Sequence, residues 1–151
     1  MHKQMLNVQA FHNRLQVSHK RDFFHGQPCD NLKDFGLSLI SFSKALEPEV
    51  NEDTRVLRAH LLIEEVGEFV LALEKGDEHE ALDALTDLLY VLIGTAVTFD
   101  WPLSEAFDEV HRSNMTKEKQ PTDPSAARVR QKGPNYSPPD IKGILQAYRS
   151  R

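Results

Sequence analysis

Six acidic residues in two short stretches of this sequence have the type and spacing to bind a metal ion. They are Glu64, Glu65 and Glu68 in a first acid cluster and Glu80, Asp83 and Asp87 in a second acid cluster. Both stretches are otherwise rich in leucine, alanine and valine. Burying a carboxylate costs free energy unless a positive charge compensates it. We therefore expect a cation at these acids, which favours a metal-dependent enzyme over a passive helical bundle.

Helical geometry places each cluster on one face. At about 100° per residue, the three acids of each cluster share a face, and Tyr90 extends the face of the second. Only residues 75–77 separate the two helices, so they should pack antiparallel with their acids facing each other. Oxygen-only ligands favour Mg²⁺, with Mn²⁺ as the second candidate, and two such ions can hold a phosphate chain. Because the first helix is apolar nearly all round, we expect it to be buried.

Two other uses of these acids compete with magnesium binding. Arg55 and Arg58 precede the first cluster on the same helix and could neutralise it through ion pairs, although two matched clusters in consecutive apolar helices weigh against this. A di-iron bundle uses Glu-x-x-His motifs. No histidine follows any of the six acids by three residues, and the nearest histidines, His60 and His79, precede them. The sequence therefore favours Mg²⁺ over iron.

The elements that must position the acids are helices, since helical spacing dominates and no strand pattern stands out. We expect helices at residues 3–19 and 31–46, from about 53 to 75 and from 77 to 98, and at 104–114 and 140–148. The expected caps are Gly76, Asp77, Ser104 and Asp140. Residues 115–139 contain five prolines and few apolar side chains, which predicts an extended segment.

These elements predict one all-α domain, a bundle of four or five helices with an extended C-terminal arm. Residues 1–116 form the helical core with the acidic metal site. Residues 117–151 form the basic C-terminal arm with a short last helix. The few helices leave apolar surface uncovered, so we expect a homodimer or homotetramer to complete the bundle.

Composition narrows the partners of this 151-residue chain. The net charge is −5, yet residues 117–151 hold eight basic side chains against three acidic ones, so the preceding segment carries −10. An acidic body argues against nucleic-acid binding, whereas an acidic site beside a basic arm suits a small phosphorylated ligand. No stretch approaches about 20 consecutive apolar residues, which predicts no membrane partner. The N-terminus lacks the apolar core of a signal peptide, and Cys29 is the only cysteine, so we expect a cytoplasmic protein.

Three motifs resemble those of the MazG-like, all-α nucleoside triphosphate pyrophosphohydrolases, which include phosphoribosyl-ATP pyrophosphohydrolases and dimeric dUTPases. The motifs are Glu64-Glu65-x-x-Glu68, Asp83-x-x-x-Asp87-Leu-Leu-Tyr-Val, and Glu109-Val-His-Arg-Ser-Asn-Met-Thr-Lys117 with Lys132-Gly-Pro-Asn-Tyr136 downstream. The second departs from the usual Glu-x-x-Asp before the Leu-Leu pair, because Ala84 holds the Glu position. Asp83 is expected to substitute for it, although Glu80-x-x-Asp83 also matches the motif one turn earlier.

The resemblance implies a Mg²⁺-dependent enzyme that cleaves a nucleoside triphosphate between its α- and β-phosphates to monophosphate and pyrophosphate. The implied metal ligands are Glu64, Glu65, Glu68, Asp83 and Asp87. Glu64 or Glu65 would orient the attacking water or accept its proton. The implied substrate-binding residues are Tyr90, His111, Asn114, Lys117, Lys132, Asn135 and Tyr136.

Several of these assignments have alternatives. His111 could equally be a buried, hydrogen-bonded histidine, and Tyr90 could equally pack in the core. For Arg112 we expect a surface ion pair rather than a substrate contact. For the whole chain, Ala84 favours the alternative of a non-catalytic nucleotide-binding module with the same fold. A carboxylate-bridged redox protein is a third, weaker reading.

Overall fold

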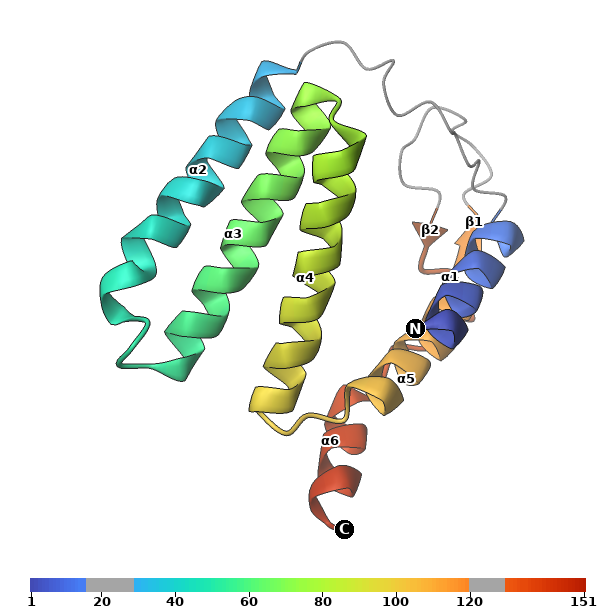
Figure 1. Ribbon diagram of the computed structural model, residues 1–151. Coiled ribbons are helices and arrows are strands. Elements are labelled where there is room, and N and C mark those ends of the chain that lie inside the picture. Colours follow the sequence, from blue (N-terminus) through green and yellow to red (C-terminus); the bar gives the residue numbers. More distant parts are fainter. Residues whose placement is uncertain (16–28, 120–129) are drawn as a thin grey trace. The chain divides into compact units, whose positions relative to one another are not determined.

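The protein is almost entirely helical in a computed structural model that describes residues 1–15, 29–119 and 130–151 (Figure 1). These residues form α1 (His2–Arg14), α2 (Asp30–Leu46), η1 (Glu47–Glu49), α3 (Thr54–Lys75), α4 (Glu78–Thr98), α5 (Leu103–Met115), β1 (Glu118–Lys119), β2 (Arg130–Gln131) and α6 (Ile141–Arg149). The two short strands pair antiparallel, with Glu118 opposite Gln131, and were not expected. The all-α prediction is confirmed.

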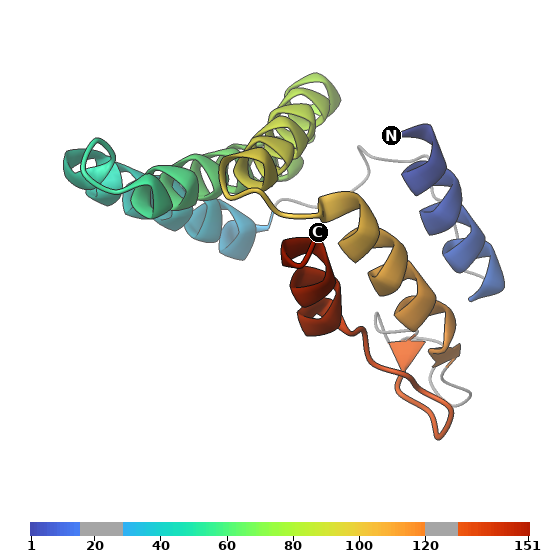
Figure 2. The same ribbon diagram turned by 90° about the horizontal axis from the view of Figure 1, so that it is seen from below.

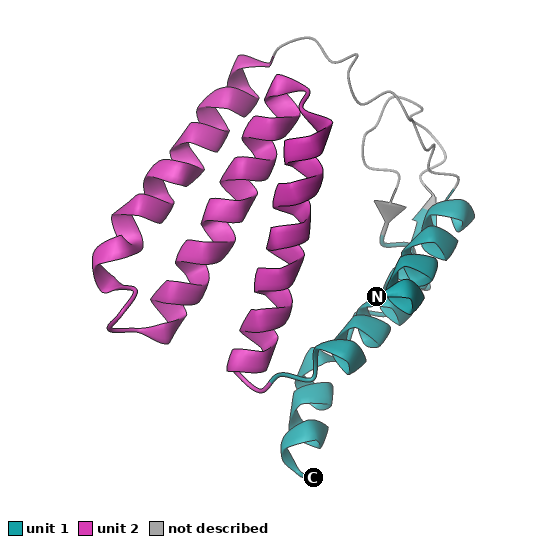
Figure 3. Ribbon diagram, in the orientation of Figure 1, with its two compact units in different colours: residues 1–19, 101–151 teal, residues 20–100 magenta. Residues whose placement is uncertain are grey.

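The chain divides into two compact units, residues 20–100 and residues 1–19 with 101–151 (Figure 3). In the unit of residues 20–100, α2, α3 and α4 lie side by side with α3 in the middle, as Figures 1 and 2 show. Two glycines allow α2 and α3 to approach closely. A Cβ atom on Gly36 would lie 2.7 Å from Leu71 Cγ, and one on Gly67 would lie 2.8 Å from Ile40 Cδ1. On the other side of α3, small residues such as Ala84 of α4 are buried.

Local capping sets the ends of the α3–α4 hairpin as the sequence predicted. The Asp53 carboxylate accepts a hydrogen bond of 2.7 Å from the backbone N–H of Arg55 and begins α3. Gly76 ends α3 with a left-handed φ of 68°, a conformation that side chains disfavour. Asp77 accepts a hydrogen bond of 3.1 Å from the N–H of Glu80 and begins α4. The predicted bounds and antiparallel pairing of these two helices are therefore confirmed.

The prediction that the first acidic helix is buried all round is wrong. Along α3 only Gly67, Val70 and Ala72 are buried. The reason is that α2 and α4 pack on two opposite sides of α3 and leave the surface between them accessible to solvent. Helix α4 is exposed as well, with Leu82 at 65% and Val97 at 75% exposure.

Helix α4 also meets a simple criterion for a membrane span. It is the one helix among the described ranges that is long and apolar enough, by length and composition alone. A core helix of a soluble protein passes the same test, and the acids of the second cluster interrupt its apolar surface. The length and composition of α4 therefore do not decide between a membrane-spanning helix and a helix of a soluble bundle.

The unit of residues 1–19 and 101–151 contains α1, α5 and α6. Lys3 Nζ lies 2.6 Å from Asp108 Oδ2 and links α1 to α5. The Asp140 carboxylate accepts a hydrogen bond of 2.8 Å from the N–H of Gly143 and begins α6, as predicted. The predicted Ser104 cap is wrong, because α5 begins one residue earlier, after Pro102, with no side-chain cap bond. The first helix ends at Arg14, and its predicted extension over residues 16–19 lies outside the described residues.

Candidate metal and nucleotide site

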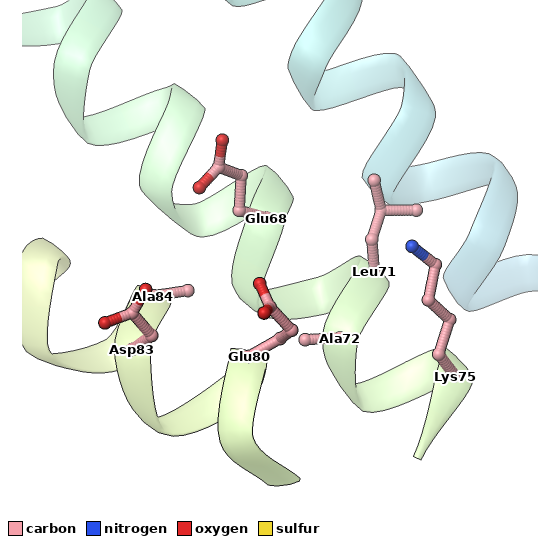
Figure 4. A pocket seen from close by; sticks show the side chains of 7 residues that line it. All are labelled: Glu68, Leu71, Ala72, Lys75, Glu80, Asp83 and Ala84. Carbon is pink, nitrogen blue, oxygen red and sulfur yellow. The ribbon is translucent and has the colours of Figure 1, made fainter. Parts of the chain in front are cut away.

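The two acid clusters lie on neighbouring helices of the α3–α4 hairpin. At the turn end of the hairpin, Glu68 and Lys75 of α3 line a pocket together with Glu80 and Asp83 of α4 (Figure 4). Buried Ala84 lines the same pocket. A side chain at the Ala84 position is therefore directed between the helices, whereas Asp83 lies beside it with an exposed carboxylate.

The acids influence one another across the hairpin. Burial is the largest cause that raises the pKa of Glu65, followed by the negative charges of Glu68, Asp87, Glu64 and Asp83. Glu68 is an exposed residue, but neighbouring protein atoms exclude part of the solvent around its carboxyl group, and this partial burial leads the causes that raise its pKa, ahead of charges from both clusters. Raised carboxyl pKa values mean that the ionised cluster lacks sufficient positive charge nearby. Such a cluster is suited to bind a cation.

A buried oxygen of Glu65 supports the same conclusion. Glu65 Oε2 is shielded from solvent and has no hydrogen-bond partner. Leaving a buried acceptor unsatisfied costs free energy, which a bound cation would offset. The carboxylate donor set fits Mg²⁺ or Mn²⁺ by chemistry. However, within the described parts of the chain, no three acidic, histidine or cysteine side chains converge closely enough to hold an ion.

The exposure of the acids differs from the expectation that both clusters are buried. Glu68, Glu80, Asp83 and Asp87 are exposed, and the side chain of Glu64 is 39% exposed. The cause is the side-by-side arrangement of the three helices, which covers only the flanks of α3. A cation at this surface would remain accessible to a ligand from solution.

Neither nearby arginine neutralises the acid clusters in the part of the chain that the structure describes. Arg55 Nη2 lies 2.5 Å from Asp53 Oδ2, and this hydrogen bonding lowers the pKa of Asp53 to about 2. The buried Nε of Arg58 has no hydrogen-bond partner. The ion-pair alternative for the acids therefore finds no support at these two residues.

His60 is a neighbour of the first cluster that the sequence reasoning missed as a functional residue. Its Nε2 lies 3.7 Å from Glu64 Oε2, while its Nδ1 contacts Ser43 of α2. In the sequence, the position of His60 served only to argue against an iron site. The signal that could have found it is the spacing of four residues between His60 and Glu64, which places them together on a helix.

The predicted substrate-binding residues fall into separate groups. Lys117 Nζ donates a hydrogen bond of 2.7 Å to Asn114 Oδ1 at the end of α5. Lys132 Nζ lies 5.0 Å from the centre of the Tyr136 ring. Asn135 is exposed and His111 is partly exposed. All these residues belong to the unit of residues 1–19 and 101–151, whereas the acids belong to the other unit.

Tyr90 lies in the same unit as the acids, on α4. Its residue exposure is 80%, so it does not pack in the core of this chain. The core-packing alternative for Tyr90 is therefore wrong for the single chain, and the ring is available to a ligand or to another protein surface.

A network on α5 fixes the segment that leads to α6. Arg112 donates to Glu109, with Nη2 2.7 Å from Oε1, and also to Ser137 Oγ and the Pro138 carbonyl oxygen at 3.0 Å. Glu109 also accepts a hydrogen bond of 2.8 Å from the N–H of Asp140. The Arg112 side chain is the main cause that lowers the pKa of Glu109 to about 2. The predicted surface ion pair of Arg112 is confirmed, while its contacts to residues 137–140 were not foreseen.

Comparison with known proteins points to one family. A family model described as phosphoribosyl-ATP pyrophosphohydrolase matches residues 39–114. The match covers half of the chain and contains both acid clusters and Asn114. It confirms the resemblance that the motifs indicated. No curated protein and no solved structure matches the chain.

Proposed function

This chain belongs to the phosphoribosyl-ATP pyrophosphohydrolase family, and we propose that it is a Mg²⁺-dependent nucleoside triphosphate pyrophosphohydrolase. The reaction would cleave between the α- and β-phosphates and release a nucleoside monophosphate and pyrophosphate. Family membership supports hydrolysis of a phosphoanhydride bond. The observation that carries the metal dependence is the pair of neighbouring acid clusters, in which the buried Glu65 Oε2 lacks a partner.

The chain's own residues would divide the chemistry as follows. Glu65, Glu68, Asp83 and Asp87 would hold the cation, with Glu64 as a further ligand or as the residue that orients water. Bound Mg²⁺ would supply positive charge against the phosphates and make a bound water more acidic, and Mn²⁺ could replace it. A carboxylate that is not committed to the cation, Glu64 or Glu65, would align the attacking water and accept its proton.

The unit of residues 1–19 and 101–151 would supply most of the substrate contacts. Asn114 and Lys117, already hydrogen bonded to each other, would donate to phosphate or sugar oxygens. We assign further substrate contacts to the remaining predicted residues, Tyr90, His111, Lys132, Asn135 and Tyr136. The exposed Tyr90 ring supports its role.

We place the enzyme in the cytoplasm as a homodimer or homotetramer, with no nucleic-acid or membrane partner. The exposed apolar side chains of α4 support self-association, because a second copy would remove them from water. The acidic body supports the absence of nucleic-acid binding.

An assay of pyrophosphate release tests the proposed function. Common and modified nucleoside and deoxynucleoside triphosphates are offered with Mg²⁺ or Mn²⁺, and we expect turnover of at least one that a chelator abolishes. Glu68→Ala should abolish activity because it removes a ligand and little packing, since Glu68 is exposed. Glu74→Ala on the same helix is the control and should retain activity. No turnover with any nucleotide, or an active Glu68→Ala variant, would reject the assignment.

A second candidate is a non-catalytic nucleotide-binding module of the same fold. The buried Ala84 favours it, because the family motif has a glutamate at that position and this chain has a methyl group there. Calorimetry combined with product analysis separates the two functions. Nucleotide binding without any monophosphate or pyrophosphate would support the module.

A further inference from the structure

His60 connects the buried contact between α2 and α3 to the first acid cluster. Its Nδ1 lies 2.9 Å from the hydroxyl oxygen of Ser43 and 2.9 Å from the carbonyl oxygen of the same residue. Ser43 is only 1% exposed, and the side chain of His60 is 13% exposed. Because two groups of a buried residue on the neighbouring helix contact one ring nitrogen, the orientation of the imidazole is fixed.

The other ring nitrogen is directed at Glu64. Nε2 lies 3.7 Å from Glu64 Oε2, one helical turn further along α3. In the tautomer in which Nδ1 accepts from the Ser43 hydroxyl, Nε2 carries the proton and presents it to the carboxylate. The Ser43 carbonyl oxygen can only accept, so its contact with Nδ1 is a hydrogen bond only when Nδ1 carries a proton. The distance is that of an ion-pair contact rather than a short hydrogen bond. A small movement of the exposed Glu64 side chain would shorten it.

Glu64 is the one acid of the first cluster that lies beside a histidine ring; Glu65 and Glu68 have different surroundings in the described residues. Glu65 has a buried oxygen without a partner. For Glu65 and Glu68, no ion pair is found within the described residues, whereas Glu64 faces Nε2 of His60, a ring whose position is set by Ser43 of α2. Neighbouring carboxylates whose surroundings differ in this way take different roles in many enzymes.

We propose that His60, held by Ser43, is a positioning residue that orients Glu64, and that Glu64 aligns the attacking water while Glu65 and Glu68 serve the metal. The proposal rests on the proposed function. Pairs of freely rotating surface groups contribute little, because holding both in place costs side-chain entropy. The ring of His60 is already ordered by Ser43, so only the Glu64 side chain must be restrained.

Two conservative substitutions of His60 distinguish two roles of this residue: orienting Glu64 and holding α2 against α3 through Ser43. His60→Gln keeps a donor close to the place of Nε2 and loses the contact of Nδ1. His60→Asn keeps an amide group, which can donate or accept, close to the place of Nδ1 and does not reach Glu64. We expect kcat to fall about 10- to 100-fold in His60→Asn, a typical loss when a partner of a metal-site carboxylate is removed. His60→Gln should recover most of it, and the nucleotide KM should change less in both.

The reverse order of the two variants overturns the proposal. If His60→Asn retains kcat and His60→Gln loses it, then His60 serves only the contact with Ser43. Thermal unfolding of both variants is measured alongside, so that a loss of folded protein is not mistaken for a loss of positioning.

A double-mutant cycle tests whether His60 acts through Glu64. If it does, His60→Asn should cause no further loss of kcat in a Glu64→Gln background, although it does so in the wild type. Losses that simply multiply show that the two residues act independently, which also overturns the proposal.

Imidazole NMR of the metal-free, ¹⁵N-labelled protein provides a readout that does not depend on activity. The resonance that disappears in His60→Asn identifies His60 among the seven histidines. We expect its Nε2 resonance to shift in Glu64→Gln and to stay in place in the matched Glu65→Gln variant. An unchanged resonance in Glu64→Gln overturns the proposal even if the protein is an active enzyme. A shift in a protein that hydrolyses no nucleotide instead rejects the proposed function, and with it the catalytic assignment of Glu64.

Discussion

The acids of α3 destabilise the metal-free fold when they are ionised. The pKa values of Glu65 and Glu68 are raised above the ordinary value of 4.5 by burial first and then by the surrounding negative charges. The folded state therefore binds these protons more tightly than the unfolded chain. Their contribution to stability is fully present below the unfolded pKa and is lost as the pH rises through the folded pKa.

Removing one of these charges should stabilise the protein at neutral pH. Glu64 and Glu68 are four residues apart on a helix, and such like-charge pairs cost about 0.2–0.5 kcal/mol. We expect Glu68→Gln to increase the free energy of unfolding of the metal-free protein by about this amount at pH 7. The increase should vanish when the pH is lowered below about 4.5. Denaturant titrations at both pH values measure it.

Glu74→Gln provides the control for this prediction, because Glu74 lies on α3 outside the acid cluster. A stability gain in Glu74→Gln equal to that in Glu68→Gln would show that the gain comes from net charge rather than from the cluster. A loss of stability in Glu68→Gln at neutral pH would contradict the prediction.

The sequence predicted which acids share a helix face, but it did not predict how exposed they are or which residues of other helices lie near them. Residue spacing determines which side chains share a helix face, so Glu64, Glu65 and Glu68 could be grouped before the structure was known. Their exposure depends on which helices cover α3, and hydropathy alone did not show that. The contact of His60 with Ser43 joins residues on two different helices, so no local pattern revealed it.

The contact between α2 and α3 leaves no room for an added methyl group at its glycine, whereas the contact between α3 and α4 does. Gly67 packs on α2, where an added Cβ would lie 2.8 Å from Ile40 Cδ1 and 3.2 Å from Leu39 Cβ. Gly94 of α4 has more room, since the nearest atom to an added Cβ is Arg58 Nη1 at 3.5 Å. The two glycines therefore form a matched pair for the same substitution.

Alanine at these two positions should have opposite effects on stability. Gly94→Ala should increase the free energy of unfolding by about 0.5–1 kcal/mol, because alanine favours the helix. Gly67→Ala should decrease it, because overpacking costs about 1–3 kcal/mol and exceeds the helix preference. Chemical denaturation of both variants gives the comparison. Equal gains in the two variants would mean that the α2–α3 contact can separate at little cost.

Capping residues made the helix bounds predictable where the signal was local. Gly76, Asp77 and Asp140 act as expected, because each cap depends on backbone groups within a few residues. The start of α5 was misjudged, since Ser104 resembles a cap although the helix already begins after Pro102. The pairing of β1 with β2 joins two-residue segments, which are too short to produce a strand pattern.

At the scale of the whole molecule, several large apolar side chains of the described residues are exposed. Leu82, Leu85 and Val97 of α4 are exposed, as is Phe42 of α2. Contiguous exposed apolar surface commonly marks a contact with another protein. We therefore expect sedimentation to show a dimer or a tetramer.

Replacing Leu82 and Val97 together by glutamate should shift the protein toward the monomer, because charged groups are costly to bury in an apolar contact. Met5→Glu combined with Leu6→Glu places the same two charges on exposed residues of α1 and is the control. A wild-type protein that sediments as a monomer, or that partitions into membranes, would contradict the predicted assembly.

The paired strands β1 and β2 have a practical consequence for protein engineering. Because they pair antiparallel, the chain leaves and re-enters the described structure at neighbouring positions, with Lys119 opposite Arg130. Lengthening a connection whose ends are already held together adds only a small closure entropy. The stretch between the strands is therefore a natural place to insert a fluorescent reporter or an affinity tag, away from both chain termini and outside the α3–α4 hairpin.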